Sequence, residues 1–401
     1  MNNMENLNLA SYSIDFGTSN TVITRWNNVT KQPEIISIPN ISQKLVNNPS
    51  VIPSLIYVEN ALNNQFILGQ SVRDQGLDLS NNSRFFRDFK RGIGTTIQGF
   101  LPELDEVNIT FEQVGEWFLN SLLNNLQAES KDSLSSLVLT VPVASFESYR
   151  NWLTQVCQGW EIEQIRIIDE PTAAALGYGA TGEKLVLVMD FGGGTLDLSL
   201  VKLDLQTQQT RQGFILKWGN KVLGNHAAQQ AKLAKVLGKA GANLGGSDLD
   251  TWILDDLVQN QGLTRSTLTT RLAEKLKIKL SSQTTAKEVY FDDKLFKSYT
   301  LELERSRFEL LLQKHQFFEQ LDELMNQVLQ QGRRNGIEKS DIEAVLLVGG
   351  TTQIPAVQNW VQQYFDPAKI RSDRPFEAIA LGALQLAQGI TVQDFLYHSY
   401  G

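Results

Sequence analysis

Two stretches of the chain repeat one order of apolar and polar positions. In each stretch an apolar run ends in Asp-Phe-Gly, a few glycine and hydroxyl residues follow, and a second apolar run begins. The first stretch covers residues 14–26 and the second covers residues 188–203. Two apolar runs joined by a short turn of this composition predict a β-hairpin. The sequence therefore predicts two hairpins of the same design in distant parts of the chain.

Alternating strand and helix patterns predict an α/β fold for the rest of the chain. Apolar side chains recur every fourth position in residues 111–126, which predicts an amphipathic helix. Further helices are expected after Glu170-Pro171 and Ile354-Pro355, because proline is tolerated in the first turn of a helix. Strands are expected at residues 52–58, 137–141, 164–168, 185–190 and 344–348. Since the second half repeats the first in outline, we expect a duplicated domain with a cleft between its halves.

The turns of the two hairpins carry the chemistry of a phosphate site. Glycine permits backbone dihedrals that let several N–H groups point at one anion. Asp15 and Asp190 cannot bind phosphate directly, but they can hold a hydrated divalent cation that does. One such turn alone is ordinary hairpin chemistry, whereas two facing turns would clamp the phosphates of a nucleotide. The glycine pair Gly349-Gly350 would let a flat ring or a phosphate approach the backbone closely.

Composition narrows the class of protein without choosing its function. The 401 residues are 42% hydrophobic and 20% charged, which is typical of a globular chain with more than one core. A net charge of -8 and a pI near 5.1 argue against a nucleic-acid partner. A single cysteine, Cys157, excludes an internal disulfide, and we expect it at a buried helix position. The three histidines are scattered along the chain and suggest neither a zinc site nor a serine triad. Without a signal peptide or a membrane-spanning stretch, we expect a cytoplasmic monomer with no membrane partner.

Eight ordered motifs resemble the nucleotide-binding domain of the Hsp70 (DnaK-like) chaperone family, in the superfamily of actin and the sugar kinases. They are DFGTSN at 15–20, FKRGIG at 89–94, VPV at 141–143, IDEPTAAA at 168–175, DFGGGTLD at 190–197, LGGSDLD at 244–250, VGGTTQIP at 348–355 and EAIALGA at 377–383. The resemblance implies a duplicated actin-like (ribonuclease H-like) ATPase fold, with two lobes around a nucleotide cleft. It places lobe I at residues 1–183, lobe II at 184–376, a helix returning to lobe I at 377–390 and a linker-like tail at 391–401.

The resemblance also implies Mg²⁺-dependent hydrolysis of ATP to ADP and phosphate, with K⁺ as a further candidate ion. Lys90 would stabilise the γ-phosphate and orient the attacking water, and Glu170 would touch the water shell of the metal and couple it to Pro142. Asp15 and Asp190 would hold Mg²⁺ mainly through water. The catalytic set implied by the family is Lys90, Glu170, Asp190, Asp197 and Thr195.

Two further groups of residues match the nucleotide contacts of the family. The phosphate-binding group is Gly17, Thr18, Ser19, Asn20, Gly192, Gly193, Gly194 and Thr195. The nucleoside-binding group is Gly245, Gly246, Glu274, Lys277, Ile278, Ser281, Gly349, Gly350, Thr351 and Gln353. The partners implied are ATP and a co-chaperone or nucleotide exchange factor.

The adenine side departs from the family pattern at two positions. Ile278 and Gln353 stand where the family carries arginines that pack against the base. Because a guanidinium stacked on a flat ring contributes on the order of 1 kcal/mol or more, we expect adenine-nucleotide affinity about ten- to hundredfold weaker than is usual in the family. The alternative is that another residue, such as Ile278 itself, fills the gap.

Two segments depart from the family in length. Residues 219–244 form an expected insert, with a helix over 226–242 that carries Lys232, Lys235 and Lys239 at helical spacing. It would be a solvated lid on lobe II or a dock for an acidic partner. Residues 392–397 resemble the apolar linker that precedes the peptide-binding domain in the family, and no such domain follows here. Either the sequence stops at that linker or the family member is short.

Three functions remain open from the sequence. The first is an Hsp70-like ATPase domain whose lobes rotate on hydrolysis. The second is a scaffold or regulatory protein that binds nucleotide with negligible turnover, and the third is an actin-like filament former. The superfamily includes kinases, filaments and chaperones, so the fold alone decides between none of them.

Overall fold

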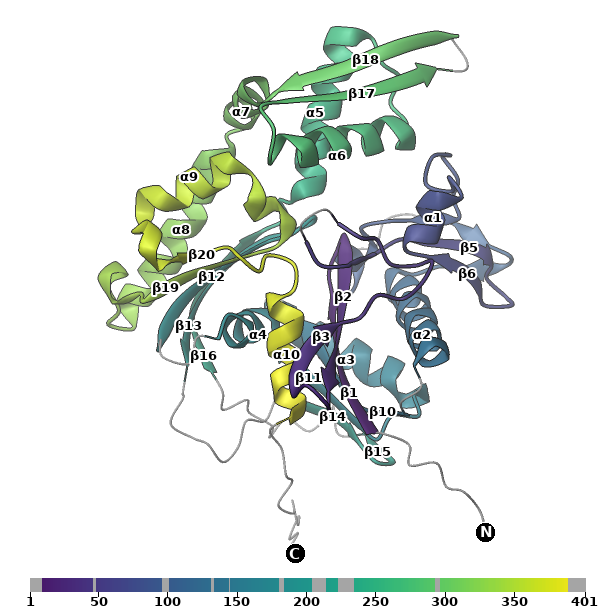
Figure 1. Cartoon of the computed structure of the whole chain (residues 1–401), viewed down its shortest axis with the longest axis vertical. Helices are drawn as coiled ribbons and strands as arrows, with labels where there is room; N and C mark the ends of the chain where they lie inside the picture. Colours follow the sequence, from purple (N-terminus) through teal and green to yellow (C-terminus); the bar gives the residue numbers. More distant parts are fainter. Residues whose placement is uncertain are drawn as a thin grey trace, which may run out of the picture.

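The computed structural model describes residues 9–45, 48–95, 101–130, 133–143, 145–179, 184–203, 214–222, 234–292 and 296–388. Two large sheets organise these residues (Figure 1). The eight-stranded first sheet runs in the order β15 (Lys221–Val222), β14 (Phe214–Trp218), β11 (Gln164–Asp169), β10 (Ser133–Val141), β1 (Leu9–Phe16), β2 (Asn20–Asn27) and β3 (Gln32–Ile35), with β4 (Ile52–Pro53) on β2. The five-stranded second sheet runs in the order β16 (Ala234–Ala242), β13 (Leu196–Leu203), β12 (Leu185–Phe191), β19 (Ala344–Val348) and β20 (Ile370–Arg371).

Both sheets are built around the same three-strand unit. In the first sheet β1 pairs antiparallel with β2 and parallel with β10. In the second sheet β12 pairs antiparallel with β13 and parallel with β19. The two predicted hairpins are therefore confirmed, and so is the duplication of the fold. We call the half built on the first sheet the first lobe and the half built on the second sheet the second lobe.

The helix predicted over residues 111–126 is confirmed as α2 (Phe111–Glu129). Its first turn is capped by Thr110, whose hydroxyl accepts a hydrogen bond from the Gln113 N–H at 3.2 Å. Its apolar stripe packs on the first sheet, in the same core as α3 (Phe146–Val156). Cys157 follows α3 in a 3-10 turn, η2 (Cys157–Gly159), and is buried. No helix among the residues that the structure describes is long and apolar enough to cross a membrane.

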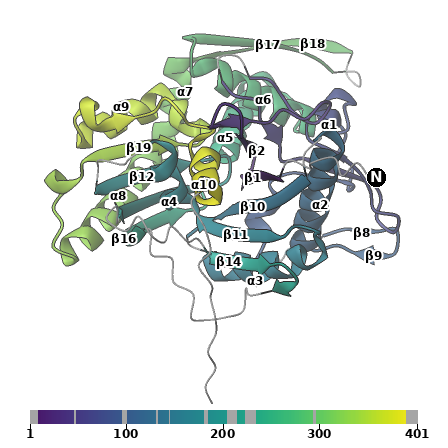
Figure 2. The same ribbon diagram turned by 60° about the horizontal axis from the view of Figure 1, so that its bottom comes forward.

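Helices α4 (Glu170–Gly177) and α10 (Ala378–Gln388) lie side by side between the two sheets (Figure 2). A buried apolar cluster there takes side chains from both helices and from strands of both sheets, including Val138 of β10 and Val188 of β12. The two helices approach closely because each has a glycine at the contact. A Cβ on Gly177 would lie 1.7 Å from the Ala378 carbonyl oxygen, and one on Gly382 would lie 1.8 Å from the Ala173 carbonyl oxygen.

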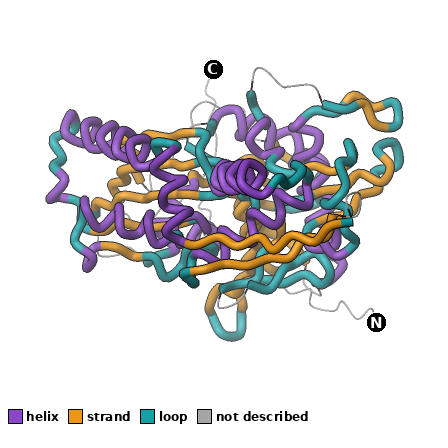
Figure 3. The backbone as a smooth tube through the Cα atoms, turned by 90° about the horizontal axis from the view of Figure 1, so that it is seen from above, coloured by secondary structure: helices purple, strands orange, loops and turns teal. Residues whose placement is uncertain are grey.

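The remaining elements cover the sheets and extend each lobe, with helices and strands mixed throughout (Figure 3). The first lobe carries β5 (Ile56–Asn60), β6 (Gln65–Leu68), β7 (Phe85–Phe86), α1 (Gln70–Asp74), η1 (Phe89–Gly92), β8 (Glu103–Leu104) and β9 (Val107–Asn108). The second lobe carries α5 (Gly246–Gln261), α6 (Thr267–Leu280), β17 (Thr285–Asp292), β18 (Lys297–Glu304), α7 (Arg305–Lys314), α8 (Phe317–Arg334), η3 (Lys339–Asp341), η4 (Gly350–Gln353), α9 (Pro355–Tyr364) and η5 (Pro367–Lys369).

Two local predictions are wrong. The strand expected at residues 52–58 is split into β4 and β5, which belong to different sheets. The described part of the helix expected over residues 226–242 is strand β16, which pairs antiparallel with β13. Alanine and lysine favour a helix, but pairing along the edge of the sheet overrides this local preference. Gly238 suits the strand, because a Cβ there would lie 2.9 Å from the Val328 carbonyl oxygen of α8.

The segment before β16 joins the first sheet, and only β15 of it lies within the insert expected at residues 219–244. Strand β14 pairs antiparallel with β11, and β15 pairs with β14, so this hairpin extends the first sheet. Both strands fall in the range expected for lobe II. Phe214 packs on Phe146 of α3 with ring centroids 4.8 Å apart, and Leu216 is buried. Residues 223–233, which include Lys232 of the expected basic helix, and the tail at 389–401 lie outside the described part of the chain.

Candidate functional site

The turns of the two hairpins face each other where the lobes meet. A Cβ added to Gly193 would lie 1.7 Å from the Ser19 hydroxyl oxygen, and one added to Gly194 would lie 2.6 Å from the Thr18 methyl carbon. Within the first turn, a Cβ on Gly17 would lie 2.3 Å from the Asn20 carbonyl oxygen. Gly193 and Gly194 thus leave room for Ser19 and Thr18 of the facing turn, and the phosphate-binding residues predicted in the two turns are brought together.

Two more of the predicted segments are bonded to the second turn. The Gly192 carbonyl oxygen accepts hydrogen bonds from the Gly246 N–H at 3.1 Å and from the Thr351 hydroxyl at 2.8 Å. Gly245 touches the same turn, since its Cβ would lie 2.3 Å from the Gly193 carbonyl oxygen. Gly349 has a φ of 85°, which favours glycine, and its Cβ would lie 2.3 Å from the Phe191 carbonyl oxygen. Four motifs that are far apart in sequence thus meet around one turn.

Four carboxylates gather next to these turns. Asp15 is the penultimate residue of β1, Glu170 begins α4, and Asp190 pairs across the hairpin with Asp197. Burial raises the pKa of Asp15 to about 6, and the charge of Glu170 adds to this effect. Burial, with the charge of Glu170, also raises the pKa of Asp197 to about 6. Burial and then the neighbouring carboxylates raise the pKa of Asp190 well above its usual range.

Lys90 is the cation of this cluster. It lies in η1, and its Nζ is 2.9 Å from Oε1 of Glu170, with only 10% of each side chain exposed. Burial is the largest single effect and lowers the pKa of Lys90. The charge of Glu170, the neighbouring Tyr149 and Asp15, and the hydrogen bond to Glu170 together outweigh burial and raise the pKa. Lys90 therefore stays charged at neutral pH. The cluster as a whole therefore contains one positive charge, that of Lys90, and four carboxylates that can each carry a negative charge.

This surplus of acid fits a divalent cation. Mutual repulsion and burial disfavour ionisation of Asp15, Asp190 and Asp197, and a bound Mg²⁺ would relieve both effects. Among the described residues, no three His, Cys, Asp or Glu side chains are arranged to ligate a metal directly. Mg²⁺ usually keeps several of its own waters, through which these carboxylates would hold it. Thr140 orients one of these acids, because its hydroxyl donates to Asp15 Oδ1 at 2.7 Å.

Of the nucleoside-binding residues predicted on α6 and after β19, Lys277 and Glu274 make polar contacts with other segments, whereas Ile278 and Gln353 do not make the arginine contacts of the family. Lys277 of α6 bonds to the Gly246 carbonyl oxygen and to Asp250, each at 2.7 Å. Glu274 pairs with Arg73 of the first lobe instead of standing free. Ile278 is 59% exposed, Ser281 lies at the end of α6, and the amide nitrogen of Gln353 is buried without a hydrogen-bond partner in the described structure. The weaker adenine affinity expected from Ile278 and Gln353 stays a prediction.

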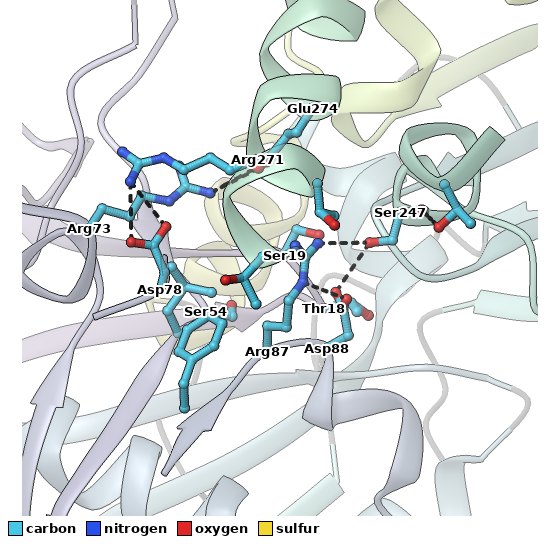
Figure 4. A pocket seen from close by; sticks show the side chains of 15 residues that line it. Thr18, Ser19, Ser54, Arg73, Asp78, Arg87, Asp88, Ser247, Arg271 and Glu274 are labelled. Carbon is cyan, nitrogen blue, oxygen red and sulfur yellow. Dashed lines mark hydrogen bonds and ion pairs between the residues drawn. The ribbon is translucent and has the colours of Figure 1, made fainter. Parts of the chain in front are cut away.

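A pocket of about 200 Å³ lies between the lobes beside the first turn (Figure 4). Thr18 and Ser19 line it from the first lobe, and one face of α6 lines it from the second lobe. Ion pairs cross from α1 and the following loop to α6, with Arg73 Nη2 3.3 Å from Glu274 Oε2 and Arg271 Nη1 3.1 Å from Asp78 Oδ2. A third link joins Ser247 of α5 to Asp88 at 3.3 Å. These contacts bridge the two lobes above the facing turns.

Sequence reasoning missed several of these residues. Thr140 immediately precedes the VPV motif. Strand β10 runs parallel to β1 and Leu139 pairs with Ile14, so the next residues, Thr140 and Asp15, lie side by side. Asp250 stands inside the LGGSDLD motif and would have been found by asking which group balances Lys277. Arg73, Asp78 and Arg271 belong to no motif, and no local signal pointed to their pairing.

Comparisons with known proteins agree with this geometry. A family model described as "Hsp70 protein" matches residues 12–210 and 233–396. The chaperone protein dnaK1 of Synechocystis sp. is 31% identical over 92% of this chain and 53% of its own length. The chaperone protein DnaK of Thermotoga petrophila is 29% identical over 92% of this chain and 58% of its own length. The chain thus spans about half the length of the curated relatives it matches.

The duplicated sheets, the facing glycine turns and the buried acid cluster define a two-lobed protein with the actin-like ATPase fold. Because the family model covers most of the sequence, the chain belongs to the Hsp70 family. The match leaves out residues 211–232, which include the β14–β15 hairpin. The family model therefore does not match that hairpin.

Proposed function

We propose that this chain binds ATP with Mg²⁺ between its lobes and hydrolyses it to ADP and phosphate. The observation that carries the proposal is the buried Lys90–Glu170 pair, at 2.9 Å, next to the facing glycine turns. Phosphoryl transfer to water depends mainly on positioning and on neutralising phosphate charge. A permanently charged lysine beside a set of acids that suits a metal ion provides that neutralisation.

The residues take the following roles in the proposal. The turns at Gly17–Asn20 and Gly192–Thr195 would bind the phosphates through backbone N–H groups and the hydroxyls of Thr18, Ser19 and Thr195. Asp15 and Asp190 would hold Mg²⁺ through water, and that ion would supply charge neutralisation on the phosphate oxygens. Lys90 would contact the γ-phosphate and help to orient the attacking water, with Glu170 and Asp197 ordering the surrounding water molecules. K⁺ is a further candidate ion at this site.

We expect steady-state release of phosphate from ATP by the purified chain in the presence of Mg²⁺, and loss of that activity when EDTA removes the ion. The reason is that the buried carboxylates and the phosphates repel each other when no divalent cation lies between them. A colorimetric phosphate assay with and without EDTA measures the effect. Turnover that is unchanged by EDTA would contradict the role given to Mg²⁺, and no turnover in either case would contradict the hydrolysis proposal.

The two lobes would rotate about the α4–α10 contact as the γ-phosphate is lost. Such a rotation would be read by a partner, and within the family a co-chaperone or a nucleotide exchange factor is the expected kind. The contacts that cross the cleft oppose opening, because they must break before the lobes separate. The Arg73–Glu274 and Arg271–Asp78 pairs are the strongest of these contacts, since their side chains are 7–23% exposed.

Replacing Arg73 with alanine is expected to speed release of bound ADP by about three- to tenfold, because loss of one partly buried ion pair costs on the order of 1 kcal/mol. Stopped-flow displacement of a fluorescent ADP analogue measures the rate. The matched control is Arg84→Ala, which removes an ion pair with Asp105 at 2.6 Å inside the first lobe and should leave the rate unchanged. Equal rates for the Arg73 variant and the parent chain would show that this pair does not hold the cleft.

A nucleotide-dependent scaffold with negligible turnover is the second candidate function. The polar links across the cleft favour it, since a protein that stays closed would hold its nucleotide for a long time. Calorimetric ATP binding without phosphate release would support this function and exclude hydrolysis. Filament formation is a third candidate, which concentration-dependent light scattering with ATP would reveal.

A further inference from the structure

Lys90 lies between two aromatic rings. Its Nζ is 5.6 Å from the centre of the Phe16 ring and 5.9 Å from the centre of the Tyr149 ring. An aromatic face attracts a cation at distances up to about 6 Å, and the attraction is larger where water is excluded. Phe16 belongs to the first hairpin and its position follows from the motif. Tyr149 belongs to no motif and lies in α3, 59 positions further along the chain than Lys90.

Tyr149 also contacts the backbone of Lys90. Its hydroxyl donates a hydrogen bond of 2.7 Å to the Lys90 carbonyl oxygen. The tyrosine is only 3% exposed, and burial raises its pKa, so the hydroxyl keeps the proton that it donates. One side chain thus contacts Lys90 at both ends, with the hydroxyl at the main chain and the ring near the ammonium group.

The surroundings of Tyr149 are rigid. Trp152, one turn further along α3, packs edge-on against Tyr149 with ring centroids 5.7 Å apart. The indole N–H of Trp152 donates to the Glu112 carbonyl oxygen of α2 at 3.1 Å, and the Glu112 carboxylate accepts from the Gly94 N–H at 2.8 Å. The segment that carries Lys90 is therefore held between α2 and α3, and Tyr149 transmits that restraint to the lysine.

We propose that Tyr149 is a positioning residue for Lys90, which fixes the ammonium group against Glu170 at the edge of the phosphate site. It would act through the lysine and not by touching ATP. This role rests on the ATP hydrolysis proposed above. Glu170 alone does not fix Lys90, because a single ion pair lets a four-carbon side chain approach from several directions. The two rings and the main-chain bond restrict those directions.

Two substitutions separate the hydroxyl from the ring. Tyr149→Phe keeps the ring and loses the hydrogen bond, so we expect kcat to fall about three- to tenfold. Tyr149→Leu loses both contacts, so we expect kcat to fall about 10- to 100-fold. The affinity for ATP, measured by calorimetry, should stay within about twofold in both variants, because Tyr149 is not expected to contact the nucleotide.

The matched control is Tyr178→Phe. Tyr178 is buried, and its hydroxyl also donates a hydrogen bond of 2.7 Å to a main-chain carbonyl oxygen, that of Leu347. It lies at the opposite end of α4 from Glu170. This variant should lose stability to a similar extent and keep the kcat of the parent chain. If Tyr149→Phe and Tyr149→Leu lower the melting temperature but leave kcat as it is in the control, the positioning role is wrong.

A second measurement needs no nucleotide. An amine-acylating reagent, with peptide mapping by mass spectrometry, reports how accessible Lys90 is in the ligand-free protein. Removing the ring in Tyr149→Leu should raise labelling of Lys90 at least about threefold over the parent chain and over Tyr178→Phe. If the parent chain does not hydrolyse ATP, the proposed function fails, and this measurement still decides whether Tyr149 restrains Lys90. Unchanged labelling would overturn that restraint.

Discussion

Replacing Lys90 with alanine is expected to lower the kcat of ATP hydrolysis on the order of 100- to 1,000-fold, the range seen when one charge-stabilising group is removed from an active site. The Lys90 ammonium group lies 2.9 Å from Glu170 in a site from which water is largely excluded, so its charge is weakly screened there. Without it, the developing charge on the γ-phosphate would face the carboxylates of Asp15, Glu170, Asp190 and Asp197. Steady-state phosphate release at saturating ATP measures the loss.

Two further variants make this result specific. Lys90→Met keeps most of the side-chain volume and removes the ammonium group, so it should be as slow as the alanine variant if that group and not the side-chain volume is the cause. Lys287→Ala removes a lysine that is 61% exposed and paired with Glu302 on the second lobe, and it should retain the parent rate. A Lys90→Ala variant that hydrolyses ATP within about threefold of the parent rate would rule out charge stabilisation by this lysine.

The two hairpins and the aspartates at their turns could be predicted from the sequence because their signals are local. A turn of glycine and hydroxyl residues between two apolar runs fixes where each strand ends, and the aspartate at the end follows directly. Two such turns can clamp one nucleotide only if they face each other. The contact of Ser19 with Gly193 confirms that they do. The predicted helix over residues 111–126 followed from its period in the same way.

The parts that could not be predicted depend on contacts between distant segments. The hydrogen bond from Tyr149 to the Lys90 carbonyl oxygen requires α3 to pack on η1, which no local pattern specifies. The ion pairs of Arg73 and Arg271 require the two lobes to be placed first. Strand β16 was mistaken for a helix because its alanines and lysines favour one, and only its pairing with β13 decides otherwise.

The position of the hairpin β14–β15 could not be predicted, although an insert was expected over residues 219–244. In the sequence the hairpin lies between β13 and β16, two strands of the second sheet. In the structure it adds two strands to the first sheet, next to β11. Its docking depends on Phe214 meeting Phe146 and on the Gly219 N–H donating to the Glu163 carbonyl oxygen at 2.7 Å. The family model does not match this segment, so the resemblance could not supply its position either.

Gly382→Ala is expected to lower the melting temperature by about 3 °C, because overpacking a tight core contact against backbone costs up to about 3 kcal/mol and a chain of this length loses about 1 °C per kcal/mol. The new Cβ would lie 1.8 Å from the Ala173 carbonyl oxygen of α4. Helix α10 cannot shift away to relieve the clash. Ser13 donates to the Ala380 carbonyl oxygen at 2.6 Å, and Arg166 donates to the Leu386 carbonyl oxygen at 3.1 Å, so the helix is bonded to the first sheet along its length.

The same measurement on Gly159→Ala provides the control for Gly382→Ala. A Cβ on Gly159 would meet no atom within 4 Å, so its melting temperature should match that of the parent chain. A Gly382→Ala variant that melts within about 1 °C of the parent would show that α4 and α10 can separate at little cost. That result would contradict the proposed rotation of the lobes about the α4–α10 contact. The lobes can rotate as rigid bodies about this contact only if the two helices stay packed.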